Sequence, residues 1–296
     1  MKKHLALITY SGLPHGAESE RLMLPYLAAA GAETEIVDWR SAACDYSKFD
    51  LIVLRSCWDY HLREAEFTEW LRRTASSVLV LNDAKTVLWN RNKFYLEELE
   101  TMGIGIAPTV FVNGSGPISL SAWQEMRSWK KSIVKPAVSA SAYKTWLFEG
   151  VAVPSEDELK SKMEGEAFLI QQFIPEIETQ GEISLIYIDS VYSHAVLKRP
   201  AAGDFRVQKE HGGSVELFHP DSNLLAQANE IAVAVPQVRE SLYCRIDAVA
   251  RNGKLVLMEL ELIEPELFLG LAEGAAERFA RAIVRRLSKN LTADER

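Results

Sequence analysis

Cysteine is scarce in this chain of 296 residues. The three cysteines, Cys44, Cys57 and Cys244, are odd in number and widely separated, so they form neither a disulfide framework nor a Cys-x-x-Cys metal pattern. A disulfide-stabilised secreted fold and a structural zinc site of that type are therefore excluded. The chain is expected to be reduced and cytoplasmic.

Long hydrophobic runs and an excess of positive charge are also missing. No stretch approaches the ~20 apolar residues that span a bilayer, and the first apolar run breaks at Tyr10-Ser11-Gly12, too early for a signal peptide. Lys and Arg total 33 against 41 for Asp and Glu, a formal charge of −8. An acidic chain is poorly suited to phosphate backbones or anionic lipid, so nucleic acid and membrane surfaces are not expected partners.

The common motifs for nucleotides and hydrolysis do not occur either. The chain has no G-x-x-x-x-G-K-[ST], no H-E-x-x-H and no G-x-S-x-G, and Gly103-Ile104-Gly105 lacks the third glycine of a dinucleotide motif. The segment Gly203-Asp204-Phe205-Arg206 lacks the kinase glycine after phenylalanine. Walker, Rossmann dinucleotide, zincin, serine hydrolase and protein kinase chemistry thus lose their main support.

Ordinary globular composition is present, with 48% hydrophobic and 25% charged residues, and the length suits about two domains or one large α/β unit. Near the N-terminus short apolar runs alternate with helical patterns, which predicts a parallel α/β sheet. These segments are residues 5–9, 19–30, 35–38, 51–55, 65–73 and 78–81. Later strands follow one another through short connections, which indicates antiparallel pairing. A turn is expected at residues 114–117.

Polar residues follow the strand predicted at residues 51–55. Ligands of parallel sheets lie beyond the carboxyl ends of the strands, so Arg55, Trp58 and Asp59 are candidate substrate contacts. Arg55 would bind a substrate carboxylate in bidentate fashion. The alternative is that Arg55 and Asp59 pair with each other while Trp58 closes the edge of the core.

Three carboxylates lie on the last two predicted strands, which flank Arg251-Asn252-Gly253. Strand alternation places Glu259 and Glu261 on one face, opposite Val256, Met258, Leu260 and Leu262. A two-residue turn at Asn252-Gly253 would point Asp247 away from the glutamates, whereas a three-residue loop pairing Ala250 with Lys254 would bring it to their side. We expect the second register, which gives a hard-oxygen site for Mg²⁺. The alternative is a solvated acidic edge balanced by Arg245.

This strand–Asp247–strand–Glu259-x-Glu261 pattern resembles the metal-binding end of ATP-grasp enzymes. Val134-Lys135-Pro136 with the small residues 137–142 is similar to the family's phosphate lysine and loop, and Asn90-Arg91-Asn92-Lys93 is similar to its first nucleotide lysine. Residues 169–175 resemble the hinge strand that contacts adenine, with Glu182 at the ribose position. Residues 203–207 resemble the glutathione synthetase-like segment whose arginine, here Arg206, faces the phosphoryl group.

The resemblance implies a fold, a reaction and a set of ligands. The implied fold is a parallel α/β domain at residues 1–90, followed by two α+β ATP-grasp lobes at residues 91–170 and 171–296. ATP would contact Lys93, Lys135, Gln172, Phe173, Ile174 and Glu182. Mg²⁺, two ions being expected and Mn²⁺ an alternative, would be held by Asp247, Glu259 and Glu261, with Arg206 catalytic. A small carboxylate would become an acylphosphate and then an amide with an amine.

Residues 55–60 and 259–265 narrow the likeness to the O-ureido-serine cyclo-ligase group, which implies ring closure within one molecule. The chain departs from the broad pattern at Glu261, where many members have Asn, in the Ser and Ala residues of the phosphate loop, and at Gln171-Gln172, which replace acidic hinge residues. Two alternatives stay open: modification of a peptide or protein tail, and a catalytically silent nucleotide-binding module. A homodimer, and the roles of Lys144, Lys198 and Arg199, are left open.

Overall fold

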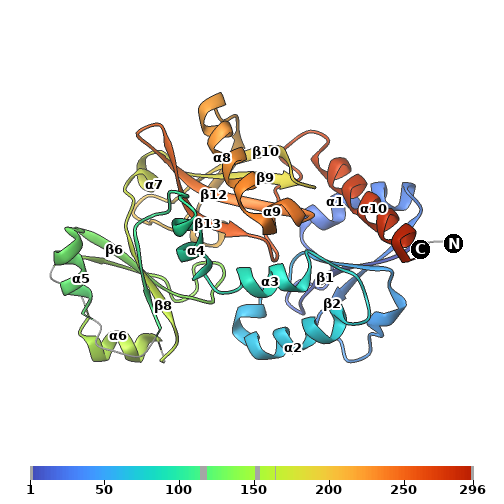
Figure 1. The fold of residues 1–296 in the computed structure, drawn as a ribbon, viewed down its shortest axis with the longest axis horizontal. Coiled ribbons are helices and arrows are strands. Elements are labelled where there is room, and N and C mark those ends of the chain that lie inside the picture. The colour runs from blue at the N-terminus through green and yellow to red at the C-terminus, as the bar shows by residue number, and fades with distance from the viewer. Residues whose placement is uncertain (1–2, 114–118, 151–153, 164, 295–296) are drawn as a thin grey trace.

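The computed structural model describes residues 3–113, 119–150, 154–163 and 165–294, which form three sheets (Figure 1). The N-terminal sheet is parallel, in the order β2-β1-β3-β4. Its strands and the helical segments of this part are β1 (Lys3–Thr9), α1 (Glu18–Ala29), β2 (Ala32–Asp38), η1 (Tyr46–Lys48), β3 (Leu51–Leu54), η2 (Tyr60–Arg63), α2 (Glu64–Ala75), β4 (Val80–Leu81) and α3 (Ala84–Asn90). The predicted parallel α/β domain is confirmed.

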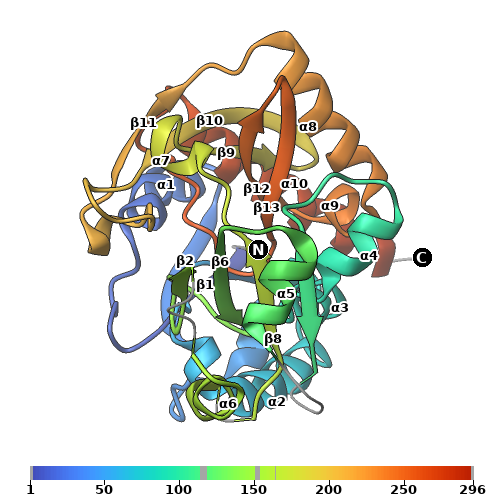
Figure 2. The ribbon, with the colours of Figure 1, turned by 90° about the vertical axis from the view of Figure 1, so that its left-hand side faces the viewer.

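A second, antiparallel sheet forms a small lobe in the order β5-β8-β6-β7. In Figure 2 this lobe is nearest the viewer, with the N-terminal sheet behind it. Its elements, with the helix that leads into it, are α4 (Tyr95–Thr101), β5 (Thr109–Val112), α5 (Leu120–Arg127), β6 (Lys131–Pro136), β7 (Trp146–Glu149), α6 (Glu156–Met163) and β8 (Phe168–Gln172). The turn expected at residues 114–117 lies outside the described residues.

The third sheet is antiparallel in the order β11-β10-β9-β12-β13, as the short connections predicted. The elements of this part of the chain are α7 (Glu176–Thr179), β9 (Glu182–Ile188), β10 (Val191–Arg199), η3 (Lys209–His211), β11 (Ser214–Phe218), α8 (Ser222–Ala234), α9 (Pro236–Glu240), β12 (Tyr243–Arg251), β13 (Lys254–Glu261) and α10 (Ala275–Asp294). Strand β11 has no counterpart in the sequence prediction.

The last helix packs against both the third sheet and the N-terminal domain. Phe279, Ile283 and Leu287 of α10 share one buried cluster with Leu5 of β1 and Leu27 of α1. In Figure 1, α10 lies beside α1. The core of the N-terminal domain is therefore completed by residues from the far end of the chain. The predicted domain boundaries at residues 90 and 170 stay a prediction, and they assign α10 to a different domain from the one whose core it completes.

Candidate active site

The hairpin that carries the carboxylates has a register that differs from the expected one. Arg251 pairs with Lys254, so Asn252 and Gly253 form a two-residue turn, and both have positive φ angles, 52° and 73°. Positive φ at both positions is the signature of a type I′ turn, for which Asn-Gly is a preferred sequence. The expected three-residue loop is therefore wrong.

A β-bulge brings Asp247 to the same side of the hairpin as the glutamates, which the two-residue turn alone would not have done. The register shifts between Asp247 and Ala248, because Ala248 faces Leu257 while Asp247 faces Glu259. Met258 is the extra residue, and an extra residue reverses the side-chain alternation on its strand. Asp247 therefore lies on the side of Glu259 and Glu261, as predicted, but its partner is Glu259, whereas the expected loop would have paired it with Leu257.

The bulge also corrects the expected faces of β13. Leu255, Leu257, Leu260 and Leu262 pack together in one buried cluster. Met258, expected on the same face as Leu260, instead packs against a different cluster, the one that contains Ile133 and Ile177, and lines the cavity.

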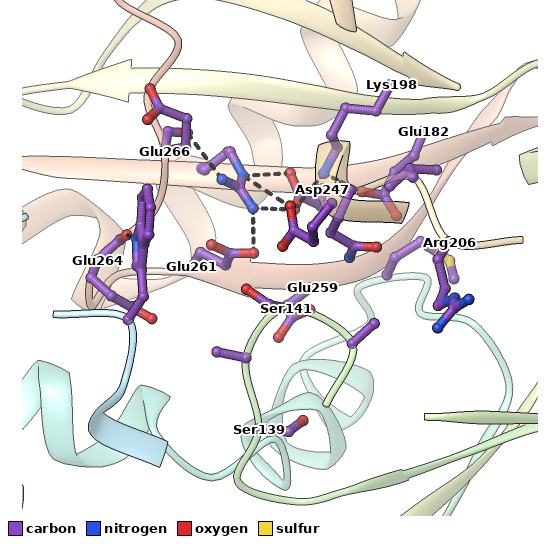
Figure 3. A pocket seen from close by; sticks show the side chains of 18 of the residues that line it. Ser139, Ser141, Glu182, Lys198, Arg206, Asp247, Glu259, Glu261, Glu264 and Glu266 are labelled. Atoms are coloured by element: carbon purple, nitrogen blue, oxygen red, sulfur yellow. Dashed lines mark hydrogen bonds and ion pairs between the residues drawn. The ribbon is translucent and has the colours of Figure 1, made fainter. Parts of the chain in front are cut away.

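A cavity of about 660 Å³ lies where the three sheets meet, and Figure 3 shows side chains that line it. One end is apolar, with Ile133, Ile177, Phe205, Val207 and Met258. Its middle is charged. The charged lining residues there are Lys93, Lys135, Glu182, Lys198, Arg206, Arg245, Asp247, Glu259 and Glu261.

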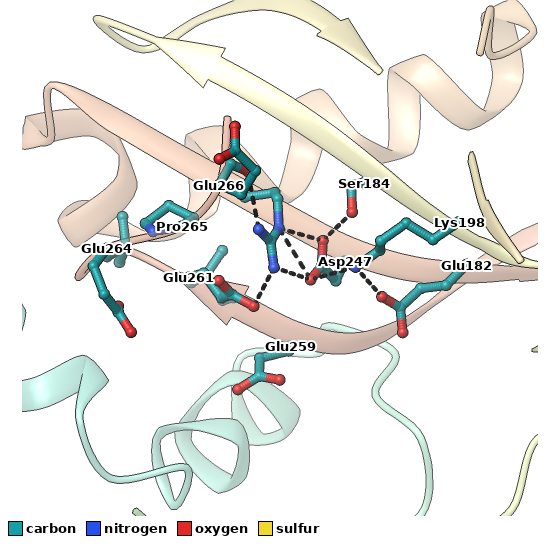
Figure 4. A network of polar contacts seen from close by, with 12 residues as sticks. Glu182, Ser184, Lys198, Asp247, Glu259, Glu261, Glu264, Pro265 and Glu266 are labelled. Carbon is teal, nitrogen blue, oxygen red and sulfur yellow. Dashed lines mark hydrogen bonds and ion pairs between the residues drawn. The ribbon is translucent and has the colours of Figure 1, made fainter. Parts of the chain in front are cut away.

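Asp247 is the centre of an ion-pair network (Figure 4). Its oxygens accept from Arg245 Nε and Nη2 at 2.9 and 3.0 Å, from Lys198 Nζ at 3.1 Å and from Ser184 Oγ at 2.5 Å. Burial by itself raises the pKa of Asp247, but Arg245 and Lys198 outweigh it and hold that pKa below the ordinary range. Lys198 also pairs with Glu182. Asp247 is therefore charged throughout the physiological pH range.

The two glutamates of β13 differ in their charge state. Burial raises the pKa of Glu261 to about 8. Its ion-pair partner Arg245 acts in the opposite direction, but the negative charges of Asp247 and Glu259 raise the pKa further. Burial also opposes the charged form of Glu259, but Lys93, whose Nζ lies 2.9 Å from Oε1, and Lys135 lower its pKa. Glu259 is thus ionised at neutral pH, while Glu261 holds its proton more strongly than an ordinary glutamate.

Lys93 and Lys135, the two predicted ATP-contacting lysines, both line the cavity and come from different elements. Lys93, just before α4, donates from Nζ to the carbonyl of Ser139 at 2.5 Å, and its backbone nitrogen donates to Ala137 at 2.8 Å. Lys93 therefore fixes the small-residue loop that follows β6. Burial lowers the pKa of Lys135 on β6.

Arg206 lines the cavity, and its guanidinium is held by Asp204, with Nε to Oδ1 at 3.0 Å and Nη2 to Oδ2 at 2.7 Å. About a third of its side chain is exposed (34%). Asp204 therefore orients the guanidinium of Arg206, which remains accessible from the cavity.

Three predicted adenine contacts do not line the cavity. Phe173 and Ile174 belong to the buried cluster that also contains the lining residues Ile133 and Ile177, and Gln172 is likewise absent from the lining. Gln171 takes the place expected for Gln172.

Of the three predicted substrate contacts, only Trp58 reaches the cavity. Arg55 is 1% exposed and its Nε lies 3.2 Å from Glu20 Oε1, inside the N-terminal domain. Asp59 accepts from Trp39 Nε1 at 2.7 Å, so it does not pair with Arg55 either. The reason is packing: the chain turns after β3 and directs Arg55 into the core.

Sequence reasoning gave Arg245 and Glu264 no role in the site, although both line the cavity. Arg245 precedes Asp247 by two residues on β12, so strand alternation alone places both on one face. Glu264 follows the end of β13, where no periodicity indicates direction.

Two family models match this chain: the N-terminal domain of D-cycloserine synthetase DcsG over residues 5–82, and the RimK-like ATP-grasp domain over residues 131–266. Residues 131–266 therefore match an ATP-grasp domain, and the chain is similar to ATP-grasp ligases, which confirms the resemblance seen in the sequence.

Within that superfamily the chain is similar to cycloserine-forming and glutathione-forming proteins. Cycloserine biosynthesis protein DcsG of Streptomyces lavendulae is 28% identical over 288 residues, which cover 90% of this chain and 93% of the relative. A glutathione synthetase of Bradyrhizobium diazoefficiens is 25% identical over 222 residues, covering 73% and 66% respectively. The crystal structure of D-cycloserine synthetase DcsG matches with a TM-score of 0.87 and 25% identity, covering 96% of this chain and 99% of that one.

The ATP-grasp fold implies binding of ATP with a divalent cation. Within the described part of the chain, no three His, Cys, Asp or Glu side chains stand close enough together to hold a metal ion as they lie. Asp247 and Glu261 are bound by Arg245, and Glu259 by Lys93. The donors fit in kind, since Mg²⁺ prefers carboxylate oxygens, but these ion pairs must exchange before a cation is held. No helix of the described residues is long and apolar enough to cross a membrane.

Proposed function

We propose that this protein is an ATP-dependent carboxylate–amine ligase that activates a small amino-acid-like substrate and closes it into a ring. The observation that carries the proposal is the charged centre of the cavity, where carboxylates and cationic side chains pair with one another. Similarity to the cycloserine biosynthesis protein over 90% of the chain favours ring closure. Use of ATP favours a cytoplasmic location.

The chemistry requires two steps. A carboxylate is a poor electrophile at neutral pH, so a carboxylate oxygen first takes the γ-phosphoryl group of ATP and ADP leaves. A nitrogen then attacks the acyl carbon, the C–N bond forms, and inorganic phosphate and a proton are lost. Phosphoryl transfer depends chiefly on positioning and on neutralisation of charge.

The residues of the cavity can supply that neutralisation. Lys93, Lys135 and Arg206 would face the phosphates, and Arg245 lies where it would meet charge developing near Asp247. Two Mg²⁺ ions, held by Asp247, Glu259 and Glu261, would neutralise phosphate charge when bound. The apolar end would receive the adenine ring, with Phe173 and Ile174 supporting the lining residues from behind and Gln172 contributing backbone groups.

Product analysis tests this function. The purified protein, ATP and Mg²⁺ are incubated with a panel of amino acids that includes both enantiomers of O-ureido-serine. ADP release that requires the amino acid, together with a product lighter than its acyclic precursor, is the expected result. A product joined to a second molecule or to a peptide would replace ring closure by intermolecular ligation, and the absence of carboxylate-dependent ADP release would refute the ligase assignment.

Replacement of Lys135 by alanine is expected to weaken ATP binding roughly tenfold to a hundredfold, because it removes one charge-assisted contact worth about 1.5–3 kcal/mol. Calorimetric titration with ATP measures this loss. Lys131→Ala is the matched control, since Lys131 lies on the same strand but pairs with Glu149 at 3.1 Å, outside the cavity lining. Unchanged ATP affinity in both Lys93→Ala and Lys135→Ala would remove the nucleotide from this place.

A further inference from the structure

The end of the cavity beside the N-terminal domain is rich in carboxylates. Glu18, Glu264 and Glu266 line it, with Ser19, Trp58 and Arg21 around them. A cluster of acids alone indicates only a solvated edge, so the state of each carboxylate decides what this end can bind.

Two of the carboxylates next to Glu264 already have partners. Glu266 accepts a hydrogen bond from Ser19 Oγ, and its Oε1 also accepts from the backbone nitrogen of Phe268 at 2.7 Å. Glu261 is paired with Arg245. These side chains are committed to holding the protein together.

Glu264 is different. It is 8% exposed, it lines the cavity, and among the described residues its carboxylate forms no ion pair and no hydrogen bond with another residue. Figure 4 shows this carboxylate pointing away from the network around Asp247. The nearby cations are occupied, Lys93 by Ser139 and Glu259, and Arg245 by Asp247 and Glu261.

The backbone around Glu264 is fixed by hydrogen bonds from three side chains. Trp58 Nε1 donates to the carbonyl of Glu264 at 3.0 Å, and Arg55 Nη2 donates to the carbonyl of Pro265 at 2.9 Å. Tyr243 Oη donates to the carbonyl of Ile263 at 2.7 Å. Three side chains from separate segments thus fix the backbone that carries this carboxylate, and none of them binds the carboxylate itself.

A buried carboxylate without a cationic partner is unfavourable as an anion, and burial raises the pKa of Glu264 to about 7. A cationic ligand would supply the missing partner and favour the charged form. We propose that Glu264 binds an ammonium group of the substrate, with Trp58 beside it offering an aromatic ring to the same cation. The inference rests on the proposed function and deepens it. It makes the substrate a zwitterion, with its ammonium at Glu264 and its carboxylate toward the γ-phosphoryl group that would activate it.

One chemical consequence follows for ring closure. An ammonium nitrogen paired with a carboxylate keeps its proton and has no lone pair to attack an acylphosphate. The nitrogen that forms the ring must therefore be a second nitrogen, carried elsewhere on the substrate. O-ureido-serine, the amino acid of the proposed function, carries such a nitrogen in its side chain.

Two probes test the site with the full chain: the O-ureido-serine enantiomer that gives the better turnover, and its des-amino counterpart, 3-(ureidooxy)propanoate. The parent protein should prefer the amino acid. In Glu264→Gln the kcat/KM for the amino acid should fall roughly tenfold to a hundredfold, mainly through KM, while that for the des-amino acid stays near its parent value. Glu230→Gln, an exposed change on α8, controls for general effects.

Each outcome decides the proposal. Equal losses for both probes would indicate a structural role for Glu264, and a loss confined to kcat would indicate proton transfer. Either result overturns the ammonium site. A parent protein that does not prefer the amino acid to the des-amino acid overturns it as well. Calorimetry with the two probes in the presence of ADP and Mg²⁺ separates the two claims. Selective binding without turnover would refute the ligase and leave the ammonium site standing. If Glu264→Gln does not fold, Glu264→Asp and the parent's preference decide.

Discussion

Replacing Glu259 by alanine is expected to lower carboxylate-dependent ADP release at least about a hundredfold, the scale found when one preorganised charge-stabilising group is removed. Glu259 lies opposite Asp247 in the hairpin and pairs with Lys93 at 2.9 Å. Its loss would remove one metal ligand in the proposed site and also free Lys93, which would bind Ser139 alone. A steady-state assay of ADP formation with saturating substrate and Mg²⁺ measures the effect.

Glu261→Asn is the matched variant. It keeps an oxygen ligand, introduces the residue found in many ATP-grasp relatives, and removes a carboxyl whose pKa is already raised to about 8 by burial. Measurable activity is therefore expected in Glu261→Asn and not in Glu259→Ala. If Glu259→Ala turned over ATP as fast as the parent, the assignment of the metal to this hairpin would fail.

Replacing Arg55 by methionine is expected to reduce the free energy of unfolding by about 3–5 kcal/mol, the range for removing one partner of a buried ion pair. Both Arg55 and Glu20 are 1% exposed, so Glu20 would keep a buried charge without its counterion. The guanidinium also lies over the rings of Tyr243 and Phe279, at 5.1 and 5.3 Å from their centroids. Denaturant unfolding followed by circular dichroism gives the difference.

Two further variants interpret that result. The double change Arg55→Met with Glu20→Gln should recover much of the loss, because it removes the unpaired charge as well. Arg63→Met removes an exposed partner of Glu66 at 3.5 Å and should cost at most about 1 kcal/mol. An Arg55→Met protein as stable as the parent, with a raised substrate KM, would instead return Arg55 to the substrate site.

Local periodicity predicted the parallel and antiparallel parts of the fold, because alternation and helical spacing depend on neighbours within a few residues. Deviations from regular structure could not be predicted in this way. The bulge at Met258 shifts the register by one residue and has no marker in the sequence, so the correct face for Asp247 was reached through a wrong loop and a wrong partner.

The direction of side chains that follow a strand could not be predicted from the sequence either. Arg55 and Trp58 both follow β3, yet one is buried against Glu20 and the other lines the cavity. Their difference depends on Pro265 and Glu264, whose carbonyls accept from them and which lie about 200 residues further along the chain. Contacts between such distant segments leave no trace in either local sequence.

The placement of α10 has a consequence for biosynthesis. Leu5, Leu7 and Val53 of the first sheet share their buried cluster with Phe279 and Ile283, roughly 200 residues beyond the end of the N-terminal domain. Translation proceeds at roughly 5–20 residues per second, so one apolar face of that sheet stays uncovered for about 10–40 s before α10 is synthesised. A nascent chain of this protein is thus a natural client for chaperones that bind near the ribosomal exit, although its first domain looks complete in sequence.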